Sequence, residues 1–513
     1  MKRRTKTPQL FLGENVGTGS TNATLISATE ILWEGKVPHA GQVAEAYGLK
    51  EGFFALAPGD FYLPPLLLVE AHEQLLEKLK KEVGTETIGN IHGMRTAAQQ
   101  HGTWWGTIEA DCVLGDLRPD LPLVNQVTGM FALPFSPMWM NSATGQECYE
   151  MTEKKPLDWW AKNSGSVPTR RFPLAQTKRL SKMYPGNWKL TTHVGLLNSL
   201  ISSIDAGALM PWDVGEALAS NLGSILMRKW LKTAIRCVPG LDQKLPDMVE
   251  TDYYEFVADW IRHRFGFDQK CRVYVGGGDN NWSIIGSGVT EPGQEVWSFG
   301  TSFTRLSILD GVPTNPDPTA HIMAAGNGRL MKMHCMSNGG RCFQHQCDLL
   351  SISLQKFDEL VAIAALATGV PPMVPFLVTE SVPVMEPRWK YSGGMEPDDS
   401  NAPLAVVQAL IGNMLLAGSN NDVKEIVATG SGASDAVCQV LADMSGATVR
   451  KGPKDTVSLG AAIGAAHYTT GIEWSELTKA LCKTTGEFHP YGNRHQYYKD
   501  EYLPALRKLI YGV

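Results

Sequence analysis

Two short glycine–threonine turns, far apart in the chain, constrain the fold most. Each turn follows a short apolar run, so each is predicted to lie where one strand folds back on the next. Glycine permits the tight backbone, and consecutive N–H groups beside small hydroxyls form a concave donor surface that suits a phosphate. One such loop in each half predicts two lobes that hold a nucleotide from opposite sides. The turns comprise Gly17, Thr18, Gly19 and Ser20 in the first half, and Gly300, Thr301 and Ser302 in the second.

The length and charge of the chain exclude several classes of protein. Its 513 residues are too many for one ordinary core, so two or more domains are expected. The composition, with 43% hydrophobic and 19% charged residues, is that of a soluble globular protein. A net charge of −6 does not suit a nucleic-acid backbone, and no apolar run reaches the ~18 residues of a membrane span. The amino terminus lacks the apolar core of a secretory signal, so a cytoplasmic location is expected.

Strand and helix patterns alternate in both halves of the chain, which indicates an α/β architecture. Strands are predicted at 272–275, 330–336 and 425–428. Helices are predicted at 64–83, 193–236, 253–263, 403–419 and 436–444. In a Gly- and Ala-rich stretch at 458–467, Gly460 and Gly464 lie four residues apart, which predicts close packing of a helix backbone against a neighbour.

Asp279 is the leading candidate for a catalytic residue. It follows three glycines at the end of an apolar strand, where a tight turn would direct its carboxylate into a cleft. A carboxylate within reach of a substrate hydroxyl can accept the hydroxyl proton during phosphoryl transfer. The alternative is that Asp279 only stabilises a turn. Its place shortly before the second phosphate-type turn favours the catalytic interpretation.

Other polar residues are candidates on weaker grounds. Gln100 and His101 end a strand-like stretch and can hydrogen-bond sugar hydroxyls, but they and Arg171 can also be read as structural or surface residues. One Cys/His cluster can be read as a metal site or as packing. We favour packing, because a strand, a turn and a helix start would spread its side chains over different faces. The cluster comprises His334, Cys335, Cys342, His345 and Cys347; the nine cysteines include no CxxC pair, which fits reduced thiols.

Further motifs occur in a characteristic order between the two turns and beyond them. They are Gln99-Gln100-His101-Gly102, Trp139-Met140-Asn141-Ser142-Ala143-Thr144 with Cys148 following, Arg171, Asp279-Asn280, Gly430-Ser431-Gly432-Ala433-Ser434 and Gln439-Val440-Leu441-Ala442-Asp443. Taken together, they resemble the FGGY carbohydrate kinases, and within these the eukaryotic-type xylulose kinases. The resemblance spans about residues 11–466.

The resemblance implies an actin-like, hexokinase-type fold of two domains, each a ribonuclease-H-like mixed sheet with flanking helices. Residues 1–288 would form the sugar-binding domain with the first phosphate loop, and residues 289–513 the nucleotide-binding domain. Asp279 would be the general base on the terminal sugar hydroxyl. The ketose would also be held by Gln100, His101, Arg171 and Asn280. The two Gly–Thr turns would hold phosphates, and the adenosine would lie against a loop containing Gly430, Gly432, Ala433 and Asp435.

The implied reaction transfers a phosphoryl group from ATP, with Mg²⁺, to D-xylulose and yields D-xylulose 5-phosphate. Kinase activity on another ketose or polyol is an alternative, because the shape of the pocket is not legible in the sequence. A homodimer would be unsurprising. The expected partners are otherwise small molecules, with no nucleic acid and no membrane.

The chain departs from the family mainly on the nucleotide side. The Asp that usually organises Mg²⁺ is replaced by Asn15, and the basic residue that closes the same loop by Asn22, while Asn141 stands where the family has another Asp. Asn keeps the shape of Asp but lacks the charge that attracts Mg²⁺. Glu14 is expected to point away from the cleft, because neighbouring side chains on a strand face opposite sides. The alternative is therefore a catalytically impaired pseudokinase that binds a sugar or a protein partner.

Overall fold

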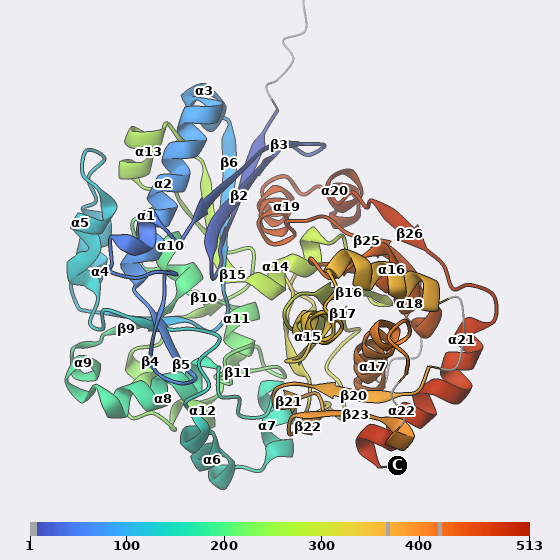
Figure 1. The fold of residues 1–513 in the computed structure, drawn as a ribbon. Helices are drawn as coiled ribbons and strands as arrows, with labels where there is room; N and C mark the ends of the chain where they lie inside the picture. The colour runs from blue at the N-terminus through green and yellow to red at the C-terminus, as the bar shows by residue number, and fades with distance from the viewer. Residues whose placement is uncertain (1–7, 366–369, 395–396, 419–422, 513) are drawn as a thin grey trace, which may run out of the picture.

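A computed structural model of the chain describes residues 8–365, 370–394, 397–418 and 423–512. These residues form two lobes side by side, each built around a large mixed β-sheet with helices on its faces (Figure 1). Within them, the first sheet has six strands in the order β14-β15-β6-β1-β2-β3. The second has seven in the order β18-β19-β17-β16-β24-β25-β26. The predicted two-lobed α/β fold is confirmed.

The first sheet is organised around the amino-terminal hairpin. β1 (Leu10–Val16) runs antiparallel to β2 (Ser20–Ile26), and its other edge pairs in parallel with β6 (Ile91–Ala98). Successive side chains of β1 face opposite sides of this sheet. The sheet is completed by β3 (Ile31–Pro38), β14 (Tyr254–Phe256) and β15 (Arg272–Gly278), and one face is covered by α2 (Pro65–Val83) and α10 (Leu197–Ala206).

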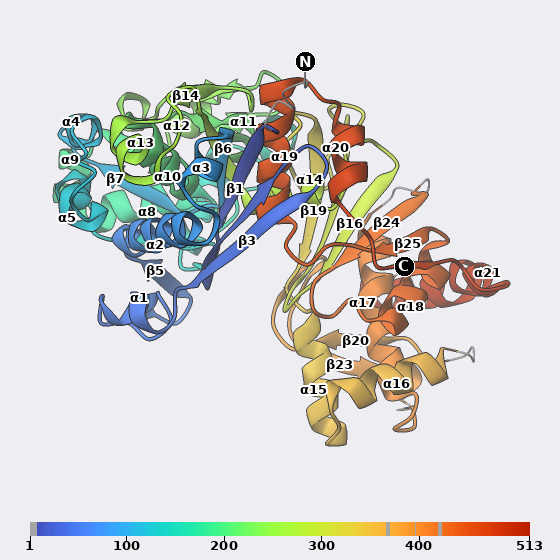
Figure 2. The ribbon, with the colours of Figure 1, turned by 90° about the horizontal axis from the view of Figure 1, so that it is seen from above.

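The opposite face of the first sheet is covered by a helix from the far end of the chain. α19 (Val457–Thr470) packs on β1, β2 and β6, and Figure 2 shows it beside β1 between the two lobes. A Cβ atom at Gly13 would lie 2.0 Å from the Ser458 carbonyl oxygen, so this contact requires glycine. The domain boundary after residue 288 stays a proposal, because this later helix completes the earlier lobe.

The second sheet carries the other Gly–Thr turn, between its strands β16 and β17. Its strands are β16 (Gln294–Phe299), β17 (Phe303–Ile308), β18 (His321–Ala324), β19 (Leu330–Met336), β24 (Glu425–Thr429), β25 (Thr448–Lys451) and β26 (Gly486–Phe488). A second apolar core lies between this sheet and its helices. These helices include α15 (Gly340–Leu350), α16 (Leu354–Ala364), α17 (Ala402–Ala417), α18 (Asp435–Ser445) and α22 (Leu503–Tyr511).

Two helices cross closely where the lobes join. A Cβ atom at Gly286, the last residue of α14 (Asp279–Gly286), would lie 1.8 Å from the carbonyl oxygen of the residue that caps α19. A Cβ atom at Gly460 would lie 2.0 Å from the Trp282 carbonyl oxygen, and one at Gly464 would lie 2.4 Å from the Trp282 ring. The predicted close backbone packing of this glycine-rich helix is confirmed.

Two of the predicted helices are wrong in extent. Within 193–236, β9 (His193–Leu196) precedes α10, and Gly207, with φ of 68°, ends that helix before short elements follow. Within 253–263, strand β14 precedes α13 (Asp259–Phe265). Apolar periodicity cannot reveal strand pairing, and here β9 pairs with β7 (Thr103–Gly106). The other predicted helices and strands correspond to α2, α17, α18, β15, β19 and β24, although residue 419 lies outside the described residues. No helix in the described part of the chain combines the length and apolarity of a membrane span.

Candidate active site

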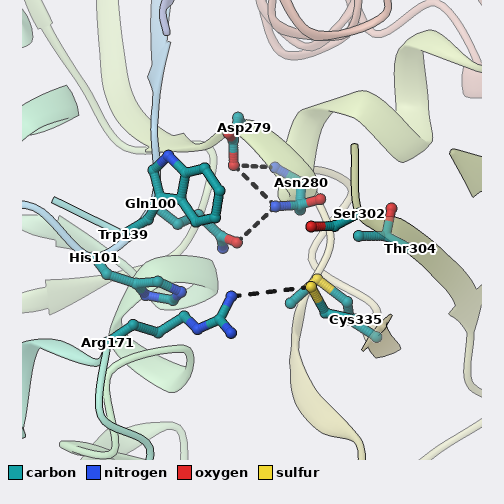
Figure 3. Close-up of a pocket in the computed structure, with 10 residues that line it drawn as sticks. Gln100, His101, Trp139, Arg171, Asp279, Asn280, Ser302, Thr304 and Cys335 are labelled. Atoms are coloured by element: carbon teal, nitrogen blue, oxygen red, sulfur yellow. Dashed lines mark hydrogen bonds between the residues drawn. The ribbon is translucent and has the colours of Figure 1, made fainter. Parts of the chain in front are cut away.

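A cavity of about 170 Å³ lies between the two lobes, and Figure 3 shows the side chains around it. The structure brings all five predicted sugar-binding residues together at this cavity. It adds a tryptophan from the first lobe and a wall from the second. The lining residues are Gln100, His101, Trp139, Arg171, Asp279 and Asn280 from the first lobe, and Ser302, Thr304, Met333 and Cys335 from the second.

The three glycines before Asp279 each allow a close contact behind the cavity. A Cβ atom at Gly276 would lie 2.9 Å from an Asn198 atom, and one at Gly277 would lie 2.4 Å from the Trp282 indole nitrogen. A Cβ atom at Gly278 would lie 2.4 Å from a Glu216 carboxylate oxygen. Neighbouring elements can therefore pack tightly against β15, which fixes the point where Asp279 begins α14.

The Asp279 carboxylate is held in place by its neighbour. Asp279 Oδ1 accepts hydrogen bonds from the Asn280 backbone N–H at 2.8 Å and from Asn280 Nδ2 at 3.0 Å. The same Nδ2 donates to Gln100 Oε1 at 2.8 Å. Burial raises the pKa of Asp279 to about 6, although the hydrogen bonds from Asn280 oppose the shift. A carboxylate with this pKa is ionised at neutral pH and accepts a proton more readily than an ordinary aspartate does.

His101 and Arg171 form the floor of the cavity. The His101 ring lies 4.5 Å from the Phe172 ring, measured between centroids. Burial, together with the charge of Arg171, holds the pKa of His101 well below its usual range, so the imidazole is neutral at pH 7. Arg171 Nη1 lies 3.9 Å from Cys335 Sγ, and this contact joins the two lobes across the cavity. A neutral imidazole beside a guanidinium suits an uncharged, hydroxyl-rich ligand.

Three residues that line the cavity, Thr304, Met333 and Cys335, were not among the predicted site residues. Met333 and Cys335 alternate along β19, so both face the same side of the second sheet. The alternation in the sequence could have shown that Met333 and Cys335 share one face of a strand. It could not have shown that this face lines the cavity, because that depends on the pairing of β19 with β17. Ser302, predicted to contact the nucleotide, also lines this cavity.

The first Gly–Thr turn joins β1 to β2 beside the cavity. The Gly17 N–H donates to the Ser20 carbonyl oxygen at 3.0 Å and closes the hairpin. The Trp139 indole N–H donates to Thr18 Oγ1 at 2.9 Å. Because Trp139 also lines the cavity, this bond ties the predicted phosphate loop to the predicted sugar site.

The predicted adenosine loop packs against the base of the second Gly–Thr turn. Gly430 has a φ of 88°, and the Gly432 N–H donates to the Phe299 carbonyl oxygen at 2.8 Å. Phe299 immediately precedes the Gly300–Ser302 turn, and Ala433 is buried in the core below. Asp435, at the start of α18, is 77% exposed as a side chain and forms an ion pair with Lys451.

Asn15 and Asn22 lie opposite each other on the hairpin and line a second cavity of about 520 Å³. The Oδ1 atoms of both side chains are buried and have no hydrogen-bond partner among the described residues. Three lysines, Lys36, Lys78 and Lys454, line the same cavity, and none forms an ion pair within the part of the chain that the structure describes. Two carboxylates, Glu34 and Asp455, line the cavity as well, so the two neutral amides lie in a mixed lining with a small excess of positive charge.

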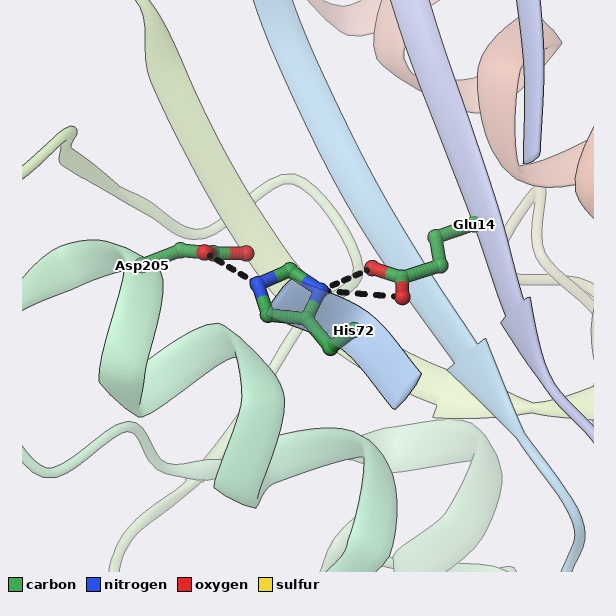
Figure 4. Close-up of side chains that lie close together, drawn as sticks. All are labelled: Glu14, His72 and Asp205. Atoms are coloured by element: carbon green, nitrogen blue, oxygen red, sulfur yellow. Dashed lines mark hydrogen bonds and ion pairs between the residues drawn. The ribbon is translucent and has the colours of Figure 1, made fainter. Parts of the chain in front are cut away.

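Glu14 points to the other face of β1, as predicted (Figure 4). His72, on α2, lies between two buried carboxylates: its Nδ1 is 2.9 Å from Glu14 Oε1, and its Nε2 is 3.0 Å from Asp205 Oδ1. The charges of Glu14 and Asp205 raise the pKa of His72 well above its usual range, against the opposing effect of burial. The two carboxylates bind opposite edges of one ring, so this cluster is a buried ion triad and not a set of ligands converging on a metal.

Asn141 does not line either cavity. Its Nδ2 donates to Asp60 Oδ1 at 2.9 Å, and Arg179 Nη2 binds the other oxygen of Asp60 at 2.7 Å. Asn141 is 1% exposed. Its observed contacts are structural, and the loss of a charge at this position removes nothing from the cavity between the lobes.

The Cys/His cluster of the second lobe is dispersed in the structure. His334 Nε2 lies 2.9 Å from Asp317 Oδ2, whereas its neighbour Cys335 faces the cavity. Cys342 Sγ lies 3.0 Å from the Pro375 carbonyl oxygen, and the His345 ring packs on Trp389. Cys347 is buried in the second core. These side chains have separate partners, as expected for packing.

The residues near the hairpin fit a hydrated Mg²⁺ better than one bound directly by the protein. The unpartnered Oδ1 of Asn15 can accept a hydrogen bond from a metal-bound water, but it supplies no charge. Glu14, the carboxylate next to it in sequence, is committed to His72 on the opposite face. The phosphates of a nucleotide, with the Glu34 and Asp455 carboxylates that line the same cavity, would supply the negative charge that holds the ion.

Comparisons with known proteins agree with this geometry. No protein-family model matches the chain. It is 26% identical to "Xylulose kinase 2" of Arabidopsis thaliana, over 95% of this chain and 90% of that protein. It is 27% identical to "Probable D-xylulose kinase A" of Aspergillus flavus, over 67% of this chain and only 62% of the relative's length, which is under two thirds. Over nearly its whole length, the chain is therefore similar in sequence to a protein named as a xylulose kinase.

The fold agrees with this relationship. A crystal structure described as a xyloylose kinase from Brucella ovis superposes with a TM-score of 0.83 at 16% identity, over 98% of this chain and 99% of that one. The resemblance to FGGY carbohydrate kinases and the actin-like, hexokinase-type fold are confirmed. The comparisons give no support to the pseudokinase alternative.

Proposed function

We propose that the protein is an ATP-dependent sugar kinase that phosphorylates a ketopentose, most specifically D-xylulose. The observation that carries the proposal is the position of Asp279, whose pKa of about 6 suits a general base, in one cavity with Gln100, His101, Arg171 and Asn280. The xylulose kinase relatives support the choice of sugar.

In the proposed reaction, Asp279 accepts the proton of the terminal sugar hydroxyl. The freed oxygen attacks the terminal phosphorus of ATP in line, and the bond to the ADP oxygen breaks. Asn280 holds the base, while His101 and Arg171 orient the other hydroxyls. The cavity lies between the lobes, so bound sugar and nucleotide would exclude water, which would otherwise compete as the acceptor.

On the nucleotide side, we propose that the Gly17–Ser20 and Gly300–Ser302 turns hold the phosphates with their backbone N–H groups. Mg²⁺ would lie near Asn15 and offset the charge of the transferring group. Lys36 and Lys454, in the cavity beside Asn15 and Asn22, would supply the positive charge that the family usually places on the hairpin. Gly430, Gly432, Ala433 and Asp435 remain the proposed adenosine contacts.

The test is ADP release coupled to a colour reaction, with D-xylulose, D-ribulose, L-xylulose and glycerol compared as acceptors. We expect sugar-dependent release that is fastest with D-xylulose and that is abolished in Asp279→Ala. Calorimetric binding of sugar without any turnover would instead support the binding-protein alternative. Equal rates with all four acceptors would contradict the assignment of the sugar but not that of the kinase.

A further inference from the structure

Behind the Gln100 side chain lies a buried carboxyl group that the proposed reaction does not use. Glu216 is 2% exposed and lies on α11 (Val214–Leu218), which Asp213 caps by accepting from the N–H groups of Gly215 and Glu216. Glu216 has no ion pair within the described residues. Burial, with Asp213 and Asp279 nearby, raises the pKa of Glu216 well above its usual range. A buried carboxyl without a cation costs stability, so its retention calls for a reason.

The partners of Gln100 fix the orientation of its amide. Gln100 Nε2 donates to Glu216 Oε1 and to Asn281 Oδ1, both at 2.9 Å. Gln100 Oε1 accepts from Asn280 Nδ2 at 2.8 Å. Turning the amide over would place its oxygen against two acceptors and its NH₂ group against a donor. Only the observed orientation presents an acceptor to Asn280.

The chain of hydrogen bonds continues to the proposed base. The Nδ2 group that Gln100 accepts from is the same one that donates to Asp279 Oδ1 at 3.0 Å. We propose that Glu216 is a positioning residue: it orients the Gln100 amide, which holds Asn280 against the Asp279 carboxylate. This inference rests on the proposed function of Asp279.

The backbone is shaped to admit this contact. A Cβ atom at Gly278 would lie 2.4 Å from Glu216 Oε1 and 2.7 Å from Gln100 Nε2. A Cβ atom at Gly215 would lie 2.6 Å from Asn281 Nδ2. Glycine at position 278 lets the Glu216 carboxyl group reach Gln100 at the end of β15, and glycine at position 215 lets α11 pack against Asn281 of α14. Either protonation state of Glu216 offers Gln100 an acceptor oxygen, so the role does not require a charge.

The test compares Glu216→Gln, which keeps an acceptor oxygen, with Glu216→Leu, which removes it at similar volume. Leaving a buried hydrogen-bond donor without a partner costs free energy equivalent to a change of about 10- to 100-fold in a rate or binding constant. We expect Glu216→Leu to lower kcat/KM for the sugar by this factor, with most of the loss in kcat, and Glu216→Gln to stay within about threefold of wild type. Glu380→Leu removes a buried carboxyl of the second lobe that has no ion pair among the described residues and does not line the cavity, and it is the control for loss of a buried carboxyl.

A double-mutant cycle separates positioning from a general structural effect. In a Gln100→Ala background, Glu216→Leu is expected to have little further effect, whereas with Arg171→Ala the two losses should multiply. Crystal structures should show the Gln100 amide displaced in Glu216→Leu and retained in Glu216→Gln. Glu216→Ala gives the same comparison where leucine prevents folding.

The inference and the proposed function fail in different ways. Wild-type protein that releases no ADP with any sugar contradicts the proposed function, and the positioning role is then decided by sugar binding in calorimetry and by the crystal structures. The inference is overturned if the Gln100 amide keeps its position in Glu216→Leu and this variant equals Glu216→Gln in kinetics or sugar binding. This outcome counts against the inference whether or not the wild-type protein releases ADP.

Discussion

The two cavities, one proposed for the sugar and one for the nucleotide, are built differently and are called here the sugar end and the nucleotide end. At the sugar end, Asp279, Asn280, Gln100 and Glu216 form an unbroken chain of hydrogen bonds between 2.8 and 3.0 Å. At the nucleotide end, the Oδ1 atoms of Asn15 and Asn22 have no partner in the described residues, and lysines face the cavity without ion pairs. On the proposed assignment, the sugar end would be organised before any ligand binds, whereas the nucleotide end would be completed by its ligand.

This difference predicts how each end responds to its surroundings. A hydrogen-bonded network whose supporting residues Gln100 and Glu216 are buried is screened little by salt, whereas exposed lysines around an open cavity are screened strongly. Sugar binding should therefore depend little on ionic strength, and nucleotide binding should weaken as salt is added. Variants at the sugar end should mainly change kcat. Variants at the nucleotide end should mainly change KM for ATP and the Mg²⁺ concentration that is required.

The largest effect is expected at the sugar end, from Asp279→Asn. The amide keeps the shape of the carboxylate but cannot accept the hydroxyl proton, so kcat should fall about 10²- to 10⁴-fold. Sugar affinity, measured by calorimetry, should change only a few-fold, because the neighbouring contacts remain. Asp120→Asn, an exposed residue paired with Arg118, serves as the control. A kcat within tenfold of wild type would show that another group takes the proton.

The next effect concerns stability and the opposite face of β1. His72→Gln removes the cation between Glu14 and Asp205, and breaking such a buried pair costs about 3 kcal/mol. Urea unfolding at pH 7 measures the loss, with the exposed His263→Gln as the control. Because the folded-state pKa of His72 is raised, the stabilisation in wild type is fully present below pH 6.5 and is lost only as pH rises through the folded-state value. Unchanged stability in His72→Gln would mean that Glu14 is not committed to this triad.

The pH dependence of catalysis tests the sugar end without a mutation. The pKa of Asp279 is raised to about 6, and the base acts only when it is ionised. Below that pH, kcat/KM should fall about tenfold for each pH unit. The rate should be flat from about pH 7 upwards until another group titrates. A profile that stays flat down to pH 4.5 would contradict a buried carboxylate as the base.

At the nucleotide end, Asn15→Asp restores a charge where the structure has an unpartnered amide oxygen. A new carboxylate beside the metal should stabilise the complex by about 1 to 2 kcal/mol, which corresponds to about tenfold. Activity at limiting Mg²⁺ should rise, and the Mg²⁺ concentration for half-maximal rate should fall. The matched control is Asn125→Asp, the same substitution at an exposed position on α5 (Leu123–Val127), away from both cavities. No rise in activity would show that Asn15 is remote from the metal.

The five first-lobe residues proposed to bind the sugar could be predicted from the sequence, whereas Glu216, the buried residue proposed to position them, could not. The strand that leads to Asp279 and the Gly–Thr hairpins have strong local signals, because apolar runs and glycines mark their ends. The position of Glu216 was missed, since residues 193–236 were predicted as a helical region. Its contact with Gln100 joins residues 116 positions apart, and it exists only because glycines allow α11 to approach β15.

The same limit applies at the nucleotide end. The substitutions at Asn15 and Asn22 were visible in the sequence, but the charged residues that line the cavity beside them were not. Lys454 precedes α19, and this helix reaches the hairpin only by packing on the sheet of the other lobe. A local pattern cannot place a residue from the end of the chain against a strand at its beginning.

The smallest effect, and the one most specific to the nucleotide end, is expected from Lys454→Gln. Exposed charge contacts contribute up to about 1 kcal/mol, so KM for ATP should rise about two- to fivefold while KM for the sugar and kcat remain the same. Lys81→Gln, on the exposed side of α2, is the control, and the difference should vanish at high salt. Adding Asn22→Lys to Lys454→Gln returns a cation to the hairpin and should recover the affinity for ATP. Recovery in the double variant would show that the cavity lysines replace the missing hairpin charge. An unchanged KM for ATP in Lys454→Gln would instead mean that the phosphates bind elsewhere and that the 520 Å³ cavity has no role in the reaction.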